Sequence, residues 1–429
     1  MSSLHQCVAI VGQYESNHIL RYMRMGDKPK NPLERVGRGM RPNGINEFPP
    51  PNTKLQEHNW QQLVSYFTNG LPQAKEELKP IVERMTGVKT SSLLKNNDEN
   101  ASRPAIIAMV SNLGQADLLT NFVCTAGDKM DLSRVLVFCT DEETLHIAQG
   151  LGLNAYYNDV LFGEVASRAA VAFGDQIFVS VMWAKVVAVH VLQQLGVDVL
   201  FQDADVVWNP DMNVHPLDLF TIGGGANIPE HVFTDNSSEF DILLVDDGAR
   251  NVMFAPYAGN SGFYYVRTND RTKWLFTSFI YIAGDLMYRV KSHQQVLSNL
   301  MSEHATTYGL RVKTMSHHPY LFGGYEYNSR TSLMKDVYRY KKVPKPLLFH
   351  MCWTQSHVHK KAFMKQMGFW QVNPQCADTQ AISQISQEDI LSTCCAAEPL
   401  VECFYSDKPS VIPCSDKAPL DKGKHDFWK

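Results

Sequence analysis

The chain has 429 residues, of which 44% are hydrophobic and 20% are charged. This composition is typical of a folded globular protein, and it excludes disorder, collagen and a coiled coil as descriptions of the whole chain. The 40 basic and 44 acidic side chains leave a net charge of −4. The molecule as a whole therefore has no field that would attract nucleic acid or an anionic membrane.

The most apolar segment covers residues 179–195, and Lys185 and His190 interrupt it. A helix that crosses a bilayer needs about 20 consecutive apolar residues, so we expect no membrane span. The first residues also lack the charged and apolar regions of a signal peptide.

Residues 1–100 are expected to form an extension that precedes the main domain. A proline cluster at 49–51 ends regular structure, and the apolar spacing over 55–85 predicts one or two amphipathic helices. The polar run over 93–104 is interpreted as a linker.

Short apolar runs alternate with helix-like stretches in the middle of the chain. The runs cover residues 105–110, 135–139 and 197–202. Continuous apolar runs of this length are typical of strands that are buried on both faces. Their alternation with helices predicts an α/β fold with a mostly parallel central sheet flanked by helices. Apolar residues that recur every three or four positions over 180–196 predict a helix ending at Gly196.

Acidic residues follow two of the predicted strands. Asp203 and Asp205 come directly after the 197–202 run, and Asp246 and Asp247 follow an apolar run over 240–245. Ligand sites in open parallel sheets lie beyond the carboxyl ends of the strands. Two carboxylates at such an edge are costly unless a cation offsets their charge, and Mg²⁺ or Mn²⁺ suits oxygen ligands. A turn cap beside a solvated carboxylate is the alternative interpretation of the pair.

Cysteines gather near the end of the chain. Their spacing is not that of a zinc site, and N-x-S/T sequons at Asn100 and Asn236 suit a secreted setting. We therefore expect disulfides in a C-terminal tail. The cysteines in question are Cys376, Cys394, Cys395, Cys403 and Cys414.

Four stretches of the sequence resemble the nucleotide-diphospho-sugar transferases of glycosyltransferase family 77. They are residues 182–210, 260–272, 293–300 and 350–353, and a weaker likeness covers about 104–370. The resemblance implies a GT-A fold, which is a Rossmann-like α/β arrangement. It also implies metal-dependent transfer of a sugar from a UDP-type donor to an acceptor hydroxyl, with retention at the anomeric carbon.

The resemblance assigns roles to residues at matching positions. Mn²⁺ (or Mg²⁺) would be held by Asp203, Asp205 and His350. Contacts to the nucleotide and its phosphates would come from Asn112, Lys185, Asp203 and Lys360. The residues alone favour a turn-forming role for Asn112, and either lysine is equally a solvated side chain.

The catalytic candidates are Asn260, Gln294, Asp246 and Asp247. Asn260 is expected to contact the sugar, and Asp246 or Asp247 to orient a hydroxyl or form a turn. We favour a front-face displacement without a protein nucleophile, while a covalent route would use Asp246, Asp247 or Gln294. One position departs from the family pattern: His293 stands where relatives carry an aspartate before Gln294.

Two other functions compete with this interpretation. One is a non-catalytic carbohydrate- or nucleotide-binding protein on a GT-A shell, which the altered His293 position motivates. The other is a haloacid-dehalogenase-like phosphatase, because its motifs also place acids after strands. The separation of Asp205 from Asp246 is too short for the intervening strands and lysine motif of that phosphatase fold.

The expected organisation has three parts: a helical, proline-containing extension (1–100), a GT-A catalytic domain (101–370) and a cysteine-containing tail (371–429). The expected donor is a UDP-sugar with xylose, arabinose or galactose, and the expected acceptor is a glycan or glycoprotein. Most similar enzymes are anchored in the Golgi, so a lumenal catalytic fragment without its anchor is expected, with a cytoplasmic location as the alternative.

Overall fold

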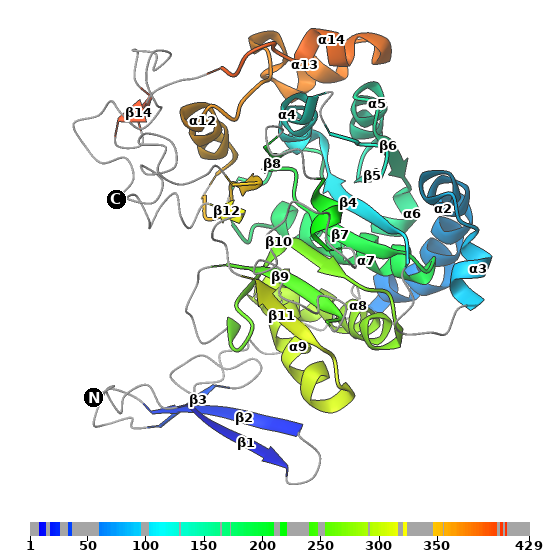
Figure 1. Cartoon of the computed structure of the whole chain (residues 1–429), viewed down its shortest axis with the longest axis vertical. Helices are drawn as coiled ribbons and strands as arrows, with labels where there is room; N and C mark the ends of the chain where they lie inside the picture. Colours follow the sequence, from blue (N-terminus) through cyan, green and yellow to red (C-terminus); the bar gives the residue numbers. More distant parts are fainter. Residues whose placement is uncertain are drawn as a thin grey trace.

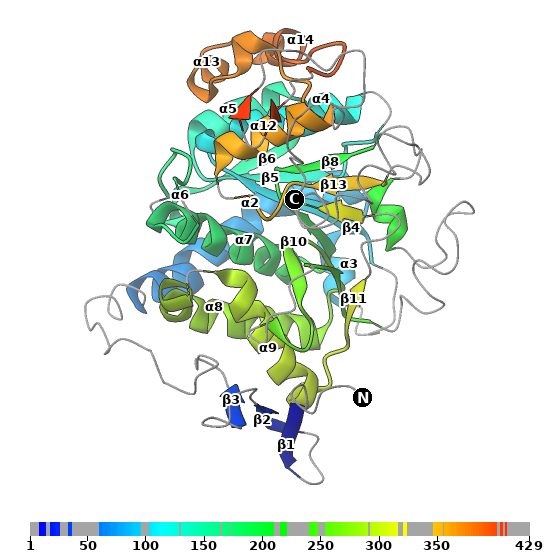
Figure 2. The same cartoon turned by 90° about the vertical axis from the view of Figure 1, so that its left-hand side faces the viewer.

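The computed structural model of the protein is shown in two views in Figures 1 and 2. It describes the backbone and most side chains over residues 60–95, 103–127, 130–163, 165–171, 173–209, 215–220, 240–247, 254–290, 292–315, 346–354 and 356–400. Elsewhere the backbone is described only in short strands.

A seven-stranded mixed sheet forms the centre of the molecule (Figure 1). Strand β10 runs antiparallel to both of its neighbours, and every other pair of adjacent strands is parallel. The predicted α/β class with a mostly parallel central sheet is thus confirmed. In spatial order the strands are β11 (Val312–Met315), β9 (Ile242–Asp246), β10 (Gly259–Val266), β7 (Asp198–Gln202), β4 (Ala105–Ser111), β5 (Val135–Cys139) and β6 (Asn154–Tyr157).

Successive residues of the central strands point into two separate apolar cores. Ile107 and Met109 of β4 belong to one core, whereas Ile106 and Ala108 belong to the other. Because side chains alternate across a strand, a strand covered on both faces must be apolar at every position. This explains the unbroken apolar runs of the sequence.

Helices cover both faces of the sheet (Figures 1 and 2). The first core lies under α4 (Ala116–Ala126), α5 (Glu142–Gly150), α12 (His357–Met367), α13 (Thr379–Ser383) and α14 (Ile390–Cys394). The second lies under α2 (Leu71–Thr86), α7 (Gln176–Gln194), α8 (Asp270–Val290) and α9 (His293–Tyr308). Shorter helices are α3 (Thr90–Lys95) and α6 (Asp159–Phe162).

Helix α7 is the helix predicted over 180–196. Asp175 caps its first turn by accepting a hydrogen bond from the backbone N–H of Phe178, and Gly196 follows its end with a positive φ of 85°. Within the described residues, α7 alone has the length and composition of a membrane-crossing helix, and most of it is buried inside the protein. Burial of this kind is typical of a core helix.

Three smaller sheets complete the strands. One consists of β12 (Leu321–Gly323), β13 (Leu348–His350) and β8 (Val206–Trp208), and it sets His350 opposite Val206. The sequence did not predict the antiparallel sheet of β1 (Val8–Gln13), β2 (His18–Met25) and β3 (Leu33–Val36), nor the pair β14 (Phe404–Tyr405) and β15 (Lys408–Pro409).

Both outer segments contribute to the cores. Leu78 and Val82 of α2 are buried in the second core, and Ile382 and Ile390 of the tail are buried in the first. In both figures the helices α13 and α14 lie beside α4 and α5. The segments on either side of residues 100 and 370 thus share the same cores. The division of the chain at these two residues stays a prediction.

Disulfides in the tail are confirmed. Cys376 is bonded to Cys394, and Cys395 is bonded to Cys124 of helix α4. The bond between Cys124 and Cys395 joins the tail to the main fold. The sequence did not indicate that Cys124 would be the partner of a cysteine in the tail. Cys403 and Cys414 lie outside the described residues, as do the sequons at Asn100 and Asn236.

Removing the bond between Cys124 and Cys395 is expected to destabilise the protein more than removing the bond between Cys376 and Cys394. The bond between Cys124 and Cys395 closes a loop with a sequence separation of 271 residues. The bond between Cys376 and Cys394 closes a loop with a sequence separation of 18 residues. Chain-entropy arguments give losses of about 5 and about 3 kcal/mol for the two double serine variants. Urea unfolding measures both, and a larger loss for the short loop would contradict this expectation.

His190 of α7 is buried and neutral at pH 7. Its Nδ1 lies 2.6 Å from the Tyr66 hydroxyl and its Nε2 lies 3.1 Å from Thr277 Oγ1. Burial, followed by the charge of Lys75, lowers the pKa of His190 to about 4. The unfolded chain therefore binds a proton near pH 6.5, whereas the folded protein does not.

Stability that depends on His190 is present above pH 6.5 and is lost as the pH falls toward 4. Between pH 7 and pH 5 we expect a loss of about 2 kcal/mol from this residue. In His190→Gln, which cannot titrate, the free energy of unfolding should fall less over that interval. Parallel pH-dependent slopes for the two proteins would contradict the assignment.

Candidate active site

Asp203 and Asp205 lie in the turn between strands β7 and β8. The backbone N–H of Asp203 donates to the carbonyl of Gly262 on β10, at 2.8 Å, and the N–H of Met351 donates to the carbonyl of Asp205, at 3.1 Å. The turn is thus held from both sides by backbone hydrogen bonds. The backbone of both aspartates therefore has a fixed position at the carboxyl end of β7.

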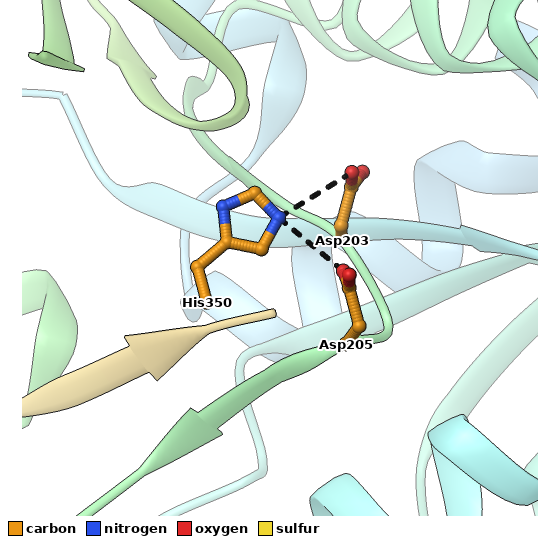
Figure 3. Close-up of side chains that lie close together, drawn as sticks. All are labelled: Asp203, Asp205 and His350. Atoms are coloured by element: carbon orange, nitrogen blue, oxygen red, sulfur yellow. Dashed lines mark ion pairs between the residues drawn. The ribbon is translucent and has the colours of Figure 1, made fainter. Parts of the chain in front are cut away.

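His350 points at both carboxylates, as Figure 3 shows. Its Nε2 lies 3.3 Å from an oxygen of Asp205 and 3.8 Å from an oxygen of Asp203. The residue ends strand β13, whose antiparallel pairing with β8 sets it beside the acidic turn. The structure thus brings His350 to a pair of carboxylates that lie far from it in the sequence.

Two lysines neutralise the two carboxylates. Lys185 of α7 lies 2.6 Å from Asp203 Oδ1, and Lys360 of α12 lies 2.6 Å from Asp205 Oδ2. Burial raises the pKa of Asp205, but Lys360 and His350 outweigh it and hold that pKa far below its usual range. Asp205 is therefore ionised at neutral pH.

The residues present fit a divalent cation. Ligand atoms of Asp203, Asp205 and His350 all lie within 4.8 Å of one another. Two carboxylates and one imidazole are a donor set that Mn²⁺ and Mg²⁺ accept. Because the ligands come from a backbone-fixed turn and a strand end, only small side-chain movements are needed to surround an ion.

Gly262 makes this close approach possible. A Cβ atom added at residue 262 would lie 2.4 Å from His350 Cε1 and 2.6 Å from Asp203 Oδ2. Glycine inside a strand often marks a place where another group comes near. Gly262 was not among the predicted site residues. Its position inside a predicted strand was nevertheless a sign that another group approaches the backbone there.

A cleft of about 870 Å³ opens over the acidic turn. Nearly all the predicted site residues line it. They are Asn112, Lys185, Asp203, Asp205, Asp247, Asn260, Gln294, His350 and Lys360. Asp246, which ends β9, is not among the described residues that line the cleft.

Several polar side chains that line the cleft hold each other in place. Asn260 donates to Asp247 Oδ1 at 2.6 Å and accepts from the N–H of Gly262 at 2.7 Å. Gln294 Oε1 accepts from both the N–H and the hydroxyl of Ser261. Burial raises the pKa of Asp247, against the hydrogen bond from Asn260.

Asn112 follows strand β4 and also lines the cleft. Its amide nitrogen donates to the carbonyls of Ala166 and Arg168, at 2.8 and 2.9 Å. Its amide N–H groups are therefore committed to the segment over 165–170. The side-chain oxygen Oδ1 of Asn112 has no hydrogen-bond partner within the described part of the chain. Only this oxygen is available for the predicted contact with the nucleotide.

Trp353 was not a predicted site residue, yet it lines the cleft close to His350. Its φ is 57°, in the left-handed region, and its indole N–H donates to the carbonyl of Asp247 at 3.0 Å. A bulky residue with positive φ is uncommon and is concentrated at functional sites. No sequence pattern indicates such a conformation for tryptophan.

The sequence model of the nucleotide-diphospho-sugar transferase family matches residues 131–364, which is more than half of the chain. The matched region contains the acidic turn, His350 and Lys360. The protein therefore belongs to this family of sugar transferases. The narrower assignment to glycosyltransferase family 77 stays a prediction.

Similar solved structures are glycosyltransferases. GlyE of Streptococcus pneumoniae TIGR4 is 14% identical with a TM-score of 0.35, and the match covers 68% of this chain and 63% of that chain. The galactosyltransferase LgtC, in complex with donor and acceptor sugar analogs, is 11% identical with a TM-score of 0.33, covering 67% and 95%. These overall similarities are weak, and family membership stands on the family model alone. No curated protein matches the chain.

We expect Gly262→Ala to weaken the binding of Mn²⁺ by at least about tenfold, because its methyl group displaces His350 and Asp203. Gly259→Ala is the matched control on the same strand, since its methyl group would meet Leu244 instead. Titration of Mn²⁺, followed by electron paramagnetic resonance, measures the affinities. Equal affinities in the two variants would contradict the proposed role of Gly262.

Proposed function

We propose that the protein transfers a sugar from a nucleoside-diphosphate donor to an acceptor hydroxyl, with retention at the anomeric carbon and with Mn²⁺ as the favoured cation. The observation that carries the proposal is the convergence of Asp203, Asp205, His350, Lys185 and Lys360 in one cleft of a nucleotide-diphospho-sugar transferase. Each is within ion-pair distance of a neighbour in the group.

Asp203, Asp205 and His350 would hold the cation. When bound, the ion supplies positive charge to the two donor phosphates and stabilises the departing nucleoside diphosphate. Lys185 and Lys360 are the chain's own cations at the same place. With the carboxylates engaged by the metal, their ammonium groups are placed to pair with phosphate oxygens.

The reaction at the sugar is proposed to be a front-face displacement. Gln294 Oε1 already accepts two hydrogen bonds from Ser261, and one oxygen of Asp247 accepts from Asn260. Groups held in this way are suited to positioning a sugar, and a front-face displacement needs no protein nucleophile. The leaving phosphate oxygen would take the proton of the acceptor hydroxyl.

The donor is proposed to be a UDP-sugar carrying xylose, arabinose or galactose, and the acceptor a glycan or glycoprotein. The disulfide from Cys124 to Cys395 supports an oxidising compartment, because such bonds persist in secretory organelles and are rare in the cytosol. A location in the Golgi lumen is therefore retained as part of the proposal.

Asp205→Asn is expected to lower the rate of Mn²⁺-dependent hydrolysis of UDP-sugars by at least about 100-fold, because the metal and Lys360 lose a charged partner. Hydrolysis is measured as release of UDP from UDP-xylose, UDP-arabinose and UDP-galactose.

Asp198→Asn is the matched control. Asp198 is a buried carboxylate at the other end of the same strand. It accepts hydrogen bonds from the Tyr265 hydroxyl and from the backbone N–H of Thr268. This variant should keep its activity when folded. Undiminished hydrolysis by Asp205→Asn, or hydrolysis that does not need a divalent ion, would contradict the proposed function.

A further inference from the structure

Helix α12 supplies Lys360 to the cleft from its first turn. The helix begins at His357, and both His357 and Lys360 line the cleft. The ammonium group of Lys360 lies 2.6 Å from Asp205 Oδ2. A lysine side chain is a flexible four-carbon stem, so the position of its charge depends on the helix that carries it. The residues that fix the first turn of α12 therefore affect the site.

Asp117, a buried carboxylate on helix α4, contacts this first turn at two points. It is 1% exposed. His357 Nε2 lies 3.0 Å from one of its oxygens, and Lys361 Nζ lies 2.6 Å from one of them. Burial raises the pKa of Asp117, but His357 and Lys361 outweigh it and hold that pKa below its usual value. Asp117 is therefore ionised at neutral pH and accepts a hydrogen bond from each of the two side chains.

The two residues that Asp117 holds lie on either side of Lys360 in the sequence. His357 and Lys361 are four positions apart, so they share one face of the helix. Lys361 also donates to the carbonyl of Ala377, at 2.7 Å. The direction of the first turn, and with it the direction of Lys360, is thus set by contacts outside the acidic turn.

Helix α4 also holds the chain beyond the other end of α12. Asn121 is buried, and its Nδ2 donates to the carbonyl of Phe369 at 2.8 Å. Its Oδ1 accepts from the backbone N–H of Gln371, also at 2.8 Å. Asp117 and Asn121 are four positions apart and so share one face of α4. A single face of α4 therefore fixes α12 at both ends.

The contact with Asp117 matters most when Asp205 binds a metal ion. Lys360 then loses its partner in the acidic turn and, in the proposed function, pairs with a phosphate oxygen. Asp117 is not among the described residues that line the cleft, so its contacts with α12 persist. We propose that Asp117 is a positioning residue: by fixing the first turn of α12, it places Lys360 to meet a phosphate of the donor. This inference rests on the proposed function.

A double-mutant cycle separates this role from a purely structural one. The experiment measures the binding of UDP in the presence of Mn²⁺ by calorimetry, for wild type, Asp117→Asn, Lys360→Met and the double variant. We expect Asp117→Asn to bind UDP about tenfold more weakly than the wild type. In the Lys360→Met background the same substitution should change the affinity by less than about twofold, because the residue through which Asp117 acts is then missing.

Lys361→Met is a milder second variant. Lys361 is not among the described residues that line the cleft, and its substitution leaves Asp117 in contact with His357. Removing one partner of a buried ion pair is destabilising, so this variant tests the proposal even if Asp117→Asn does not fold. We expect UDP to bind about threefold more weakly, again only when Lys360 is present.

Asp241→Asn is the matched control. Asp241 is a buried carboxylate that binds Arg271 and Arg311, each at 2.8 Å, and it is not among the described residues that line the cleft. Its substitution should lower the melting temperature and leave the affinity of the folded protein for UDP unchanged.

Three outcomes would overturn the proposal. Wild-type affinity for UDP in Asp117→Asn, or in Lys361→Met if the first variant does not fold, would show that Lys360 needs no such support. A loss of the same size with and without Lys360 would assign Asp117 to the fold. If the wild type does not bind UDP with Mn²⁺, the proposed function fails together with this inference.

Discussion

A buried carboxylate beside a partly buried one at the end of strand β7 is the constraint that shapes the whole site. Asp205 is 3% exposed and lies two positions along the chain from Asp203. Desolvated negative charges in such an arrangement require compensation, and the protein provides it with Lys185, Lys360 and His350. These three residues come from α7, α12 and β13. The ion pairs at one turn therefore connect three separate parts of the fold.

Backbone geometry makes this concentration of charge possible. Strand β10 runs antiparallel beside β7, and the carbonyl of its Gly262 accepts a hydrogen bond from the N–H of Asp203. The same residue has no side chain, which leaves room for His350. The neighbouring residues Asn260 and Ser261 then position Asp247 and Gln294. One short strand segment thus arranges both the acidic turn and the polar side chains of Asn260, Asp247 and Gln294 that line the same cleft.

The sequence predicted those features that depend on local patterns. The apolar runs indicated the parallel strands, because β4, β5 and β7 are buried on both faces. The position of Asp203 and Asp205 after a strand indicated the site, and the family resemblance added His350 and the lysines. Strand ends and acidic turns are local, so a single sequence contains enough information to find them.

Features that depend on contacts between distant residues could not be predicted in this way. Cys124 gives no sign that Cys395 is its partner, since disulfide connectivity does not follow from sequence. Asn112 was expected near the nucleotide, but its amide nitrogen holds the segment over 165–170, which only the folded chain brings close.

A crystal structure of the protein with Mn²⁺ and UDP, using anomalous scattering to locate the metal, would show directly whether the acidic turn binds the ion. We expect one manganese ion at roughly 2.2 Å from oxygens of Asp203 and Asp205 and from Nε2 of His350. We also expect Lys185 or Lys360 to have moved from its carboxylate to a phosphate oxygen. A manganese ion bound elsewhere, or UDP bound with both lysines still paired to the carboxylates and no metal between them, would contradict the proposed site.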